Sequence, residues 1–381
     1  MPTTRAAEKN ATANSSNGES KGNSVGSKHE IQDKKSSEPK RPKKNNDKTQ
    51  QTIEDTVASS SKTKPQPKED EKSDEEEGDN PQVQGLEKKT GTAEEPRARE
   101  GVVPSNILEK GIIYFFFRGR VGIDEPSDVN EIQRSFMILR PLDKDAKLGE
   151  GTIQDKGNIR LIAIPKKVFP RSGRDRWIAF VEKSDSSLRT LKETFFPSSD
   201  YETKTAGTRH TPAATPAAEG VYAITTTGRE SHLAYMITLP SELGQVQLEL
   251  GLRETGSFII STRNPQYDAP RGTSLPKGPD YPKEVLEEFR SLRWMPSQPH
   301  HLDYVNTQFL LVGESSGIAK ATEPQKEDDK EVKEKPEEEL EKLEDEDAHR
   351  MEDLTEDDST AIFSDLGTLS KDYPSLKTTF E

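Results

Sequence analysis

The sequence predicts a mainly β or α+β protein in which one antiparallel β-rich domain lies between two long disordered tails. Aromatic residues point to the domain, because residues 104–316 hold 20 of the 23 Phe, Tyr and Trp in the 381-residue chain. The apolar residues of this stretch come in short runs, rich in β-branched and aromatic side chains and bounded by Gly and Pro, which is typical of strands. We therefore place the folded core at residues 104–316.

Eight of these runs are expected to be strands. They are residues 112–117, 136–139, 161–164, 177–181, 221–224, 233–239, 258–260 and 309–312. Residues 186–195 and 282–292 instead have apolar side chains at helical spacing, so we expect a short helix in each.

The strand runs also repeat. Residues 136–141 (FMILRP) align without a gap with residues 235–240 (YMITLP), and residues 111–114 (GIIY) align with residues 220–222 (GVY). Downstream, residues 161–164 correspond to residues 258–260, and each copy is followed by one expected helix. The repeat predicts two β-β-β-α units related by a pseudo-twofold axis, each covering the apolar face of the other.

Residues 1–103 contain almost no large apolar side chains. They cannot offset an ordering cost of roughly 1–2 kcal/mol per residue, so we predict a disordered N-terminal arm. A compact basic cluster within the arm is a candidate nuclear import signal, although it is also compatible with chance in a Lys-rich arm. Its residues are Lys40, Arg41, Lys43 and Lys44. The location predicted is nuclear or cytoplasmic.

Two hydroxyl residues lie next to acidic runs and are candidate phosphorylation sites. Ser73 lies within the acidic run 69–79, and Thr355 directly precedes three acidic residues, 356–358.

The third segment, residues 317–381, has 9 Lys and Arg against 22 Asp and Glu, so we predict an acidic disordered tail. Near its end, Ile362, Phe363, Leu366 and Leu369 are spaced to form one apolar stripe if the segment becomes helical on a partner. The alternative is a tail that serves solubility alone.

Composition excludes several classes of protein chemistry. The chain has no Cys, which rules out disulfides, cysteine nucleophiles and Cys-ligated zinc sites. The longest apolar run, 112–117, is far shorter than the roughly 20 residues of a membrane span, so no membrane association is expected. Residues 313–317 (GESSG) match the hydrolase motif G-x-S-x-G, but a catalytic His and a following helix are not expected there. We expect no cofactor and favour a protein that is not an enzyme.

One polar stretch, residues 201–210, is dense in hydrogen-bonding side chains and lies between the two repeats. It forms either a connector or the wall of a ligand pocket. The candidate ligand-binding residues are Tyr201, Lys204, Arg209, His210, His232, Glu109 and Arg118. His300 and His301 are adjacent, and on a strand they would point to opposite faces, so no metal site is predicted from them.

A basic cluster within the core is a weak indication of nucleic-acid binding. It comprises Arg160, Lys166, Lys167, Arg171, Arg174 and Arg176, with Phe169 and Trp177 nearby. The core as a whole is neutral, with 27 residues of each charge, whereas nucleic-acid-binding domains are usually strongly basic.

Residues 107–116 (ILEKGIIYFF), 133–141, 201–205 (YETKT) and 220–222 (GVY) resemble an uncharacterised family of fungal and bacterial proteins. Its fungal members are often labelled "BTB domain transcription factor", and the similarity covers about residues 104–314. A BTB fold is a helix-rich dimerisation module, which differs from the strand-rich core predicted here. The resemblance implies no catalytic residues.

Two hypotheses for function follow. The first is a non-enzymatic interaction protein that docks protein partners through its β-rich core and its disordered arms, in a transcription or chromatin setting. The second is a small-ligand or phosphate-binding domain, either for binding alone or with a catalytic activity, with its site between the two repeats. The sequence assigns no oligomeric state.

Overall fold

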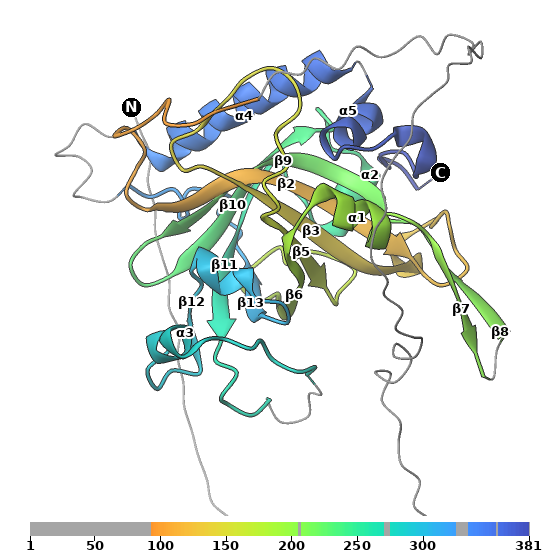
Figure 1. Cartoon of the computed structure of the whole chain (residues 1–381), viewed down its shortest axis with the longest axis horizontal. Helices are drawn as coiled ribbons and strands as arrows, with labels where there is room; N and C mark the ends of the chain where they lie inside the picture. The colour runs from red at the N-terminus through yellow and green to blue at the C-terminus, as the bar shows by residue number, and fades with distance from the viewer. Residues whose placement is uncertain (1–92, 205–206, 270–274, 325–333, 356, 381) are drawn as a thin grey trace, which may run out of the picture. The chain divides into compact units, whose positions relative to one another are not determined.

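The computed structural model describes residues 93–204, 207–269, 275–324, 334–355 and 357–380 (Figure 1). All of them belong to the second of the two units into which the chain divides, Val83–Glu381. Ser73 and the basic cluster at residues 40–44 lie outside the described residues. The folded chain begins earlier than the expected boundary at residue 104, because Ala93 is buried and strand β1 (Glu94–Glu95) pairs with β4 (Lys147–Leu148).

Eight antiparallel strands form a closed barrel, which confirms the β-rich fold class. The order β10-β9-β2-β3-β5-β6-β13-β11 is closed by pairing between β10 and β11, and β12 (Trp294–Pro296) adds to β11 outside the barrel. The barrel strands are β2 (Ile107–Gly119), β3 (Ile132–Leu142), β5 (Ile159–Ile164), β6 (Arg176–Ser186), β9 (Thr215–Thr226), β10 (Ser231–Leu239), β11 (Thr255–Arg263) and β13 (Gln308–Gly313). Each of the eight predicted runs lies within one of these strands.

Each half of the barrel is a four-strand meander, β2-β3-β5-β6 and β9-β10-β11-β13, and the halves join through the pairs β2–β9 and β6–β13. In the first pair Ile112 lies opposite Val221, Gly111 opposite Tyr222 and Ile113 opposite Gly220. This register relates Gly111 to Gly220 by a pseudo-twofold axis, as the sequence alignment predicts. A Cβ atom on either glycine would clash with a carbonyl oxygen of the next strand, that of Arg140 or Met236, so both repeats require glycine here.

The structure corrects three details of the repeat. Each half contains a fourth strand, β6 or β13, which the predicted three-strand unit left out. Helix α1 (Leu188–Thr194) follows the fourth strand of its half, whereas α3 (Lys283–Glu288) precedes the fourth strand of the other. The gapless alignment of 136–141 with 235–240 also puts residues on the wrong faces, since Phe136 packs outside the barrel and Tyr235 packs inside it.

Alternating side chains of the strands supply two apolar cores. The inner core takes residues from all eight barrel strands and fills the barrel. Leu302, in the 3-10 turn η2 (Pro299–Asp303), and Val246 and Leu250, in α2 (Gln245–Leu250), belong to the same core. The barrel is therefore a packed scaffold.

The predicted disordered tail is wrong for residues 334–355 and 357–380. Helices α4 (Pro336–Leu354) and α5 (Asp358–Asp365) pack with α1 on the outer face of β10-β9-β2-β3-β5, above the sheet in Figure 1. The predicted apolar stripe is helical, but the surface it covers is this chain's own barrel. Ile362, Phe363 and Leu366 are buried there, whereas Leu369 lies beyond α5 and is 57% exposed.

The remaining elements are short. They are η1 (Val129–Glu131), the hairpin strands β7 (Ser199–Thr203) and β8 (Gly207–Thr211), and η4 (Ser370–Asp372). Thr355 ends α4 and is half-buried. No helix among the described residues has both the length and the apolar character needed to cross a membrane.

Candidate functional site

The seven candidate ligand-binding residues are not brought together in one pocket. Tyr201, Lys204, Arg209 and His210 lie on or at the turn of the β7–β8 hairpin, and His232 lies on β10. Glu109 and Arg118 are nine residues apart on β2, a separation of roughly 30 Å along a strand.

The β7–β8 hairpin is a two-stranded sheet of its own, and it projects from the barrel (Figure 1). Its base is held by Arg118, whose Nη1 donates to the carbonyl oxygens of Pro197 (3.3 Å) and Pro212 (2.5 Å), one on each side of the hairpin. The same guanidinium donates to the carbonyl of Phe195 and lies 5.2 Å from the centre of the Phe195 ring. Arg118 is therefore an anchor for the hairpin rather than a free cation for a ligand.

His210 forms a second link between the hairpin and the barrel. Its Nδ1 lies 2.6 Å from Asp200 Oδ1, within the hairpin, and its Nε2 lies 2.9 Å from Asp124 Oδ1, in the loop after β2. The hydrogen bond to Asp200, together with Asp124, raises the pKa of His210 above its ordinary value of 6.5. The imidazolium form is the one that donates to both carboxylates.

This link predicts a pH-dependent hairpin. Because the folded-state pKa of His210 is raised, its stabilising contribution is complete below the unfolded-state pKa and is lost as pH rises through the folded-state pKa. Amide hydrogen exchange in residues 199–203 and 207–211, corrected for intrinsic rates, should speed up in the wild-type protein as the pH rises above 6.5. In Asp124→Asn with Asp200→Asn the change should be much smaller. Equal pH dependence in the two proteins would contradict the link.

Glu109 belongs to a polar network inside one end of the barrel. Its Oε1 accepts hydrogen bonds from Tyr222 Oη (2.7 Å) and Arg160 Nη1 (2.6 Å), and Arg160 Nη2 lies 2.6 Å from Asp303 Oδ1. Burial and the adjacent Glu109 carboxylate raise the pKa of Tyr222 well above its ordinary value. The carboxylate of Glu109 is thus engaged by residues of the barrel itself. Arg160, which the sequence grouped with the exposed basic cluster, is also part of this buried network.

His232 lies in a buried group that contains the residue types of a catalytic triad. His232 Nδ1 lies 2.7 Å from Glu314 Oε2, and the Ser257 hydroxyl donates to the same oxygen at 2.7 Å. Burial alone would raise the pKa of Glu314, but these two hydrogen bonds lower it. A serine is activated when its hydroxyl donates to the imidazole, whereas here it donates to the carboxylate. The group therefore lacks the hydrogen-bond order of a catalytic triad.

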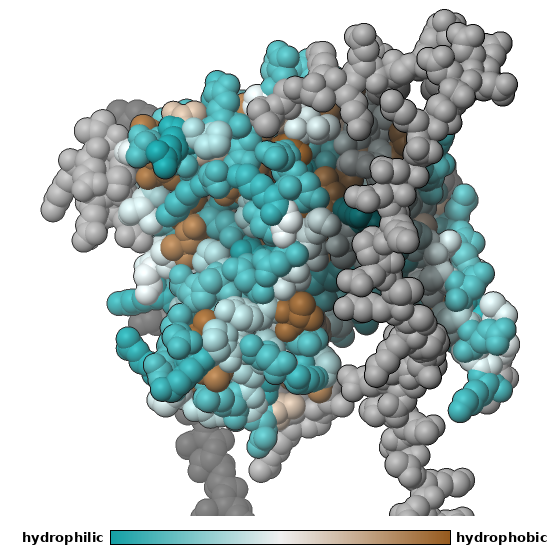
Figure 2. Space-filling view, in the orientation of Figure 1, coloured by the Kyte–Doolittle hydropathy of each residue, from teal (hydrophilic) through white to brown (hydrophobic). Residues whose placement is uncertain are grey.

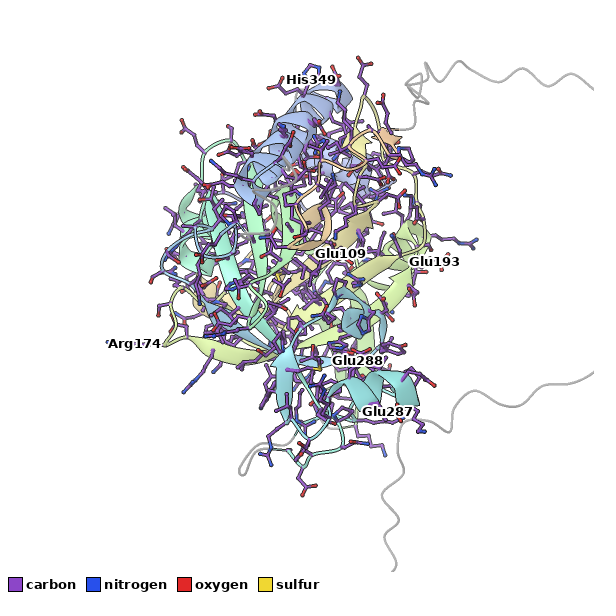
Figure 3. The ribbon with its side chains drawn as sticks, turned by 90° about the vertical axis from the view of Figure 1, so that its left-hand side faces the viewer. Glu109, Arg174, Glu193, Glu287, Glu288 and His349 are labelled. Atoms are coloured by element: carbon purple, nitrogen blue, oxygen red, sulfur yellow. The ribbon has the colours of Figure 1, made fainter. Side chains whose placement is uncertain are left out.

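The other basic residues of the cluster lie in the connection between β5 and β6 and at the first residue of β6. Arg171 Nη2 donates to the backbone carbonyls of Leu248 and Glu249. Arg174 and Arg176 are exposed, and Figure 3 shows Arg174 pointing away from the barrel.

Sequence reasoning missed one group of metal-ligating side chains, Glu288, His300 and His301. The expectation that the two histidines point to opposite faces is wrong, because they lie in η2, a 3-10 turn, and not on a strand. His300 Nε2 lies 3.0 Å and His301 Nε2 lies 3.1 Å from Glu288 Oε2, and the three ligand atoms all lie within 4.8 Å of one another. Pro299, a residue favoured in the first turn of a helix, was the signal for a turn at this point.

Comparison with known proteins gives no relative: no family model, no curated protein and no solved structure matches the chain.

Proposed function

We propose that this chain is a non-enzymatic interaction protein whose barrel holds the β7–β8 hairpin as a docking element for a protein partner. The observation that carries the proposal is that the hairpin projects from the barrel on a base fixed by Arg118 and His210. Neither β7 nor β8 pairs with a third strand within the described part of the chain, so each presents an outer edge. An exposed edge is the element to which a partner adds a strand.

The side chains of the hairpin suit a polar partner segment. Figure 2 shows the hairpin, at the right-hand edge, as mostly hydrophilic. Tyr201 is 43% exposed and lies opposite Arg209 in the antiparallel register. Tyr and Arg are the residue types that contribute most to binding energy at protein interfaces. The ligand-binding alternative gains no support, because its residues are dispersed and the carboxylate of Glu109 and the guanidinium of Arg118 are engaged within the protein.

Site-specific photo-crosslinking in extract of the source cells tests the proposal. A photoreactive residue placed at Tyr201 in the full chain should crosslink to a defined partner. The matched control is the same residue at Leu292, which is 52% exposed and lies in the connection between β11 and β13. The partner recovered at position 201 should then bind the purified chain, and Tyr201→Ala with Arg209→Ala should weaken that binding about tenfold or more.

Two outcomes would count against the hairpin as the docking element. One is an identical set of crosslinked proteins at positions 201 and 292. The other is a partner whose affinity for the purified chain does not change in the double variant.

A nuclear setting is part of the same proposal, supported by the basic cluster at residues 40–44 and by the resemblance to proteins labelled as transcription factors. Changing Lys40, Arg41, Lys43 and Lys44 together to Ala should leave a fluorescently tagged chain in the cytoplasm. Substituting Lys9, Lys21, Lys28 and Lys34 in the same arm removes equal charge and serves as the control. A nuclear signal that persists in the first variant would remove the nuclear claim.

A further inference from the structure

We propose that Glu288, His300 and His301 form a binding site for one divalent transition-metal ion, with zinc as the preferred ion. Two imidazole nitrogens and one carboxylate oxygen are a donor set that suits zinc, and three protein ligands leave a coordination position for water. The proposal is independent of the docking function, since its three residues lie in the connection between β11 and β13 and none of them belongs to the β7–β8 hairpin.

The spacing of the donor atoms is close to what zinc requires. Zinc binds imidazole nitrogen and carboxylate oxygen at about 2.0–2.2 Å, so two ligand atoms in a tetrahedral site are about 3.3 Å apart. In the structure Glu288 Oε2 lies 3.0 Å from His300 Nε2 and 3.1 Å from His301 Nε2. The third pair, His300 Nε2 and His301 Nε2, lies within 4.8 Å, so an ion between the three donors requires these two nitrogens to approach each other by at most about 1.5 Å.

The surroundings of His301 hold its Nε2 toward Glu288. The ring is fully buried and stacks on Phe289, with ring centres 5.4 Å apart and planes at 19°. Its other nitrogen, Nδ1, lies 3.2 Å from Thr262 Oγ1 and accepts the backbone N–H of Gln298 at 3.1 Å. Because Nδ1 accepts a hydrogen bond here, the ring proton lies on Nε2, facing Glu288. A metal on Nε2 requires this proton to move to Nδ1, which gives up the hydrogen bond from Gln298 and leaves Thr262 Oγ1 as the acceptor. Such a partner on the far nitrogen is usual for metal-ligating histidines.

Solvent can reach the site from the side of the other two ligands. The His300 side chain is 46% exposed and that of Glu288 is 37% exposed. Incoming metal therefore has an entry path, and water can complete the coordination. The buried His301 at the back and the two exposed ligands in front resemble an open site rather than a closed structural one.

The chain offers a matched control one residue away. Glu287 lies on the same helix, α3, and its carboxylate pairs with Lys283 Nζ at 3.3 Å (Figure 3). Changing Glu287 to Gln removes the same charge from the same helix but leaves the three proposed ligands intact.

Zinc titration of the full, untagged, chelator-treated chain in competition with a chromophoric chelator tests the site. The wild-type protein should show a site whose affinity falls about tenfold or more in Glu288→Gln and in His300→Ala, and stays unchanged in Glu287→Gln. Cobalt(II) should give the intense visible absorption of a tetrahedral complex in the wild-type protein, and that absorption should be lost in His300→Ala. Zinc should also raise the melting temperature of the wild-type protein but not that of Glu288→Gln.

The substituted side chains are partly exposed, so both variants should fold, and far-ultraviolet circular dichroism checks this. Equal zinc affinity in Glu288→Gln and Glu287→Gln would overturn the proposal. So would the absence of zinc binding by the wild-type protein, which would leave a hydrogen-bonded cluster only.

Discussion

Replacing Arg350 with Met should lower the free energy of unfolding by about 3–5 kcal/mol, because it leaves buried carboxylates without their counter-charge. Arg350 is on α4 and is fully buried. Its Nη2 lies 2.6 Å from Asp347 Oδ1, its Nη1 lies 2.7 Å from Asp365 Oδ1, and Glu219 Oε1 of β9 is 3.9 Å from Nη2. One guanidinium thus connects both tail helices to the barrel.

Arg350 is one of two buried cations that face the acids of this cluster. Arg140 Nη1 adds a second cation 3.4 Å from Asp365 Oδ2, so three acids face two arginines. Burial would raise the pKa of Asp365, but Arg350 and Arg140 lower it below its ordinary value, so this carboxyl is ionised. Burial and the neighbouring Asp347 raise the pKa of Glu219 well above its ordinary value, which favours the neutral form of Glu219.

Urea unfolding at neutral pH measures the effect. Arg189→Met is the control, since the Arg189 side chain is 84% exposed and pairs with Glu193 within α1. A surface pair of this kind contributes little to stability, so the control should unfold like the wild-type protein. If Arg350→Met also unfolded at the wild-type urea concentration, the cluster would not connect tail and barrel as described.

Much of the barrel was predictable from the sequence, because each strand carries a short β-branched or aromatic run that nothing else in the chain resembles. Strand Ile107–Gly119, for example, contains IIYFFF, buried on both faces since the inner core and the tail helices each cover one. Strands that are buried on both faces do not alternate apolar with polar residues. Their composition, and not a two-residue period, therefore identified them.

The folded state of the tail could not be predicted from the sequence, and the reason is electrostatic. Its acidic composition matches that of a solvated segment, and the charges that order it are far away in sequence. Glu339 pairs with Lys110 Nζ at 2.7 Å, and Asp365 pairs with Arg140 at 3.4 Å. A count of charge within the segment contains no information about these cations on other strands. The group of Glu288, His300 and His301 was not predicted for a similar reason. The directions of the two histidine side chains depend on a 3-10 turn, and two adjacent histidines do not by themselves indicate such a turn.

Replacing Phe363 with Ala should destabilise the whole barrel by about 3–5 kcal/mol. Phe363 is fully buried on α5, stacks on Tyr373 with ring centres 5.2 Å apart, and meets the edge of Phe196 at 6.1 Å. Phe196 in turn packs 5.6 Å from Phe116 of β2, so the tail and the barrel share one apolar core. Leu369→Ala is the matched control, since Leu369 belongs to the same predicted stripe but is 57% exposed.

Tryptophan fluorescence can separate tail loss from global unfolding. The two Trp residues of the chain, Trp177 on β6 and Trp294 on β12, lie on strands that do not contribute to the core shared with the tail. If the tail is integral to the fold, Phe363→Ala shifts the fluorescence transition and the circular dichroism transition together to lower urea concentration. Leu369→Ala should leave the free energy of unfolding from both probes within about 0.5 kcal/mol of the wild-type value. A tail that docks as a separate segment would instead melt first by circular dichroism and leave the fluorescence midpoint unchanged. That outcome would mean that residues 334–355 and 357–380 are a segment that can detach while the barrel stays folded.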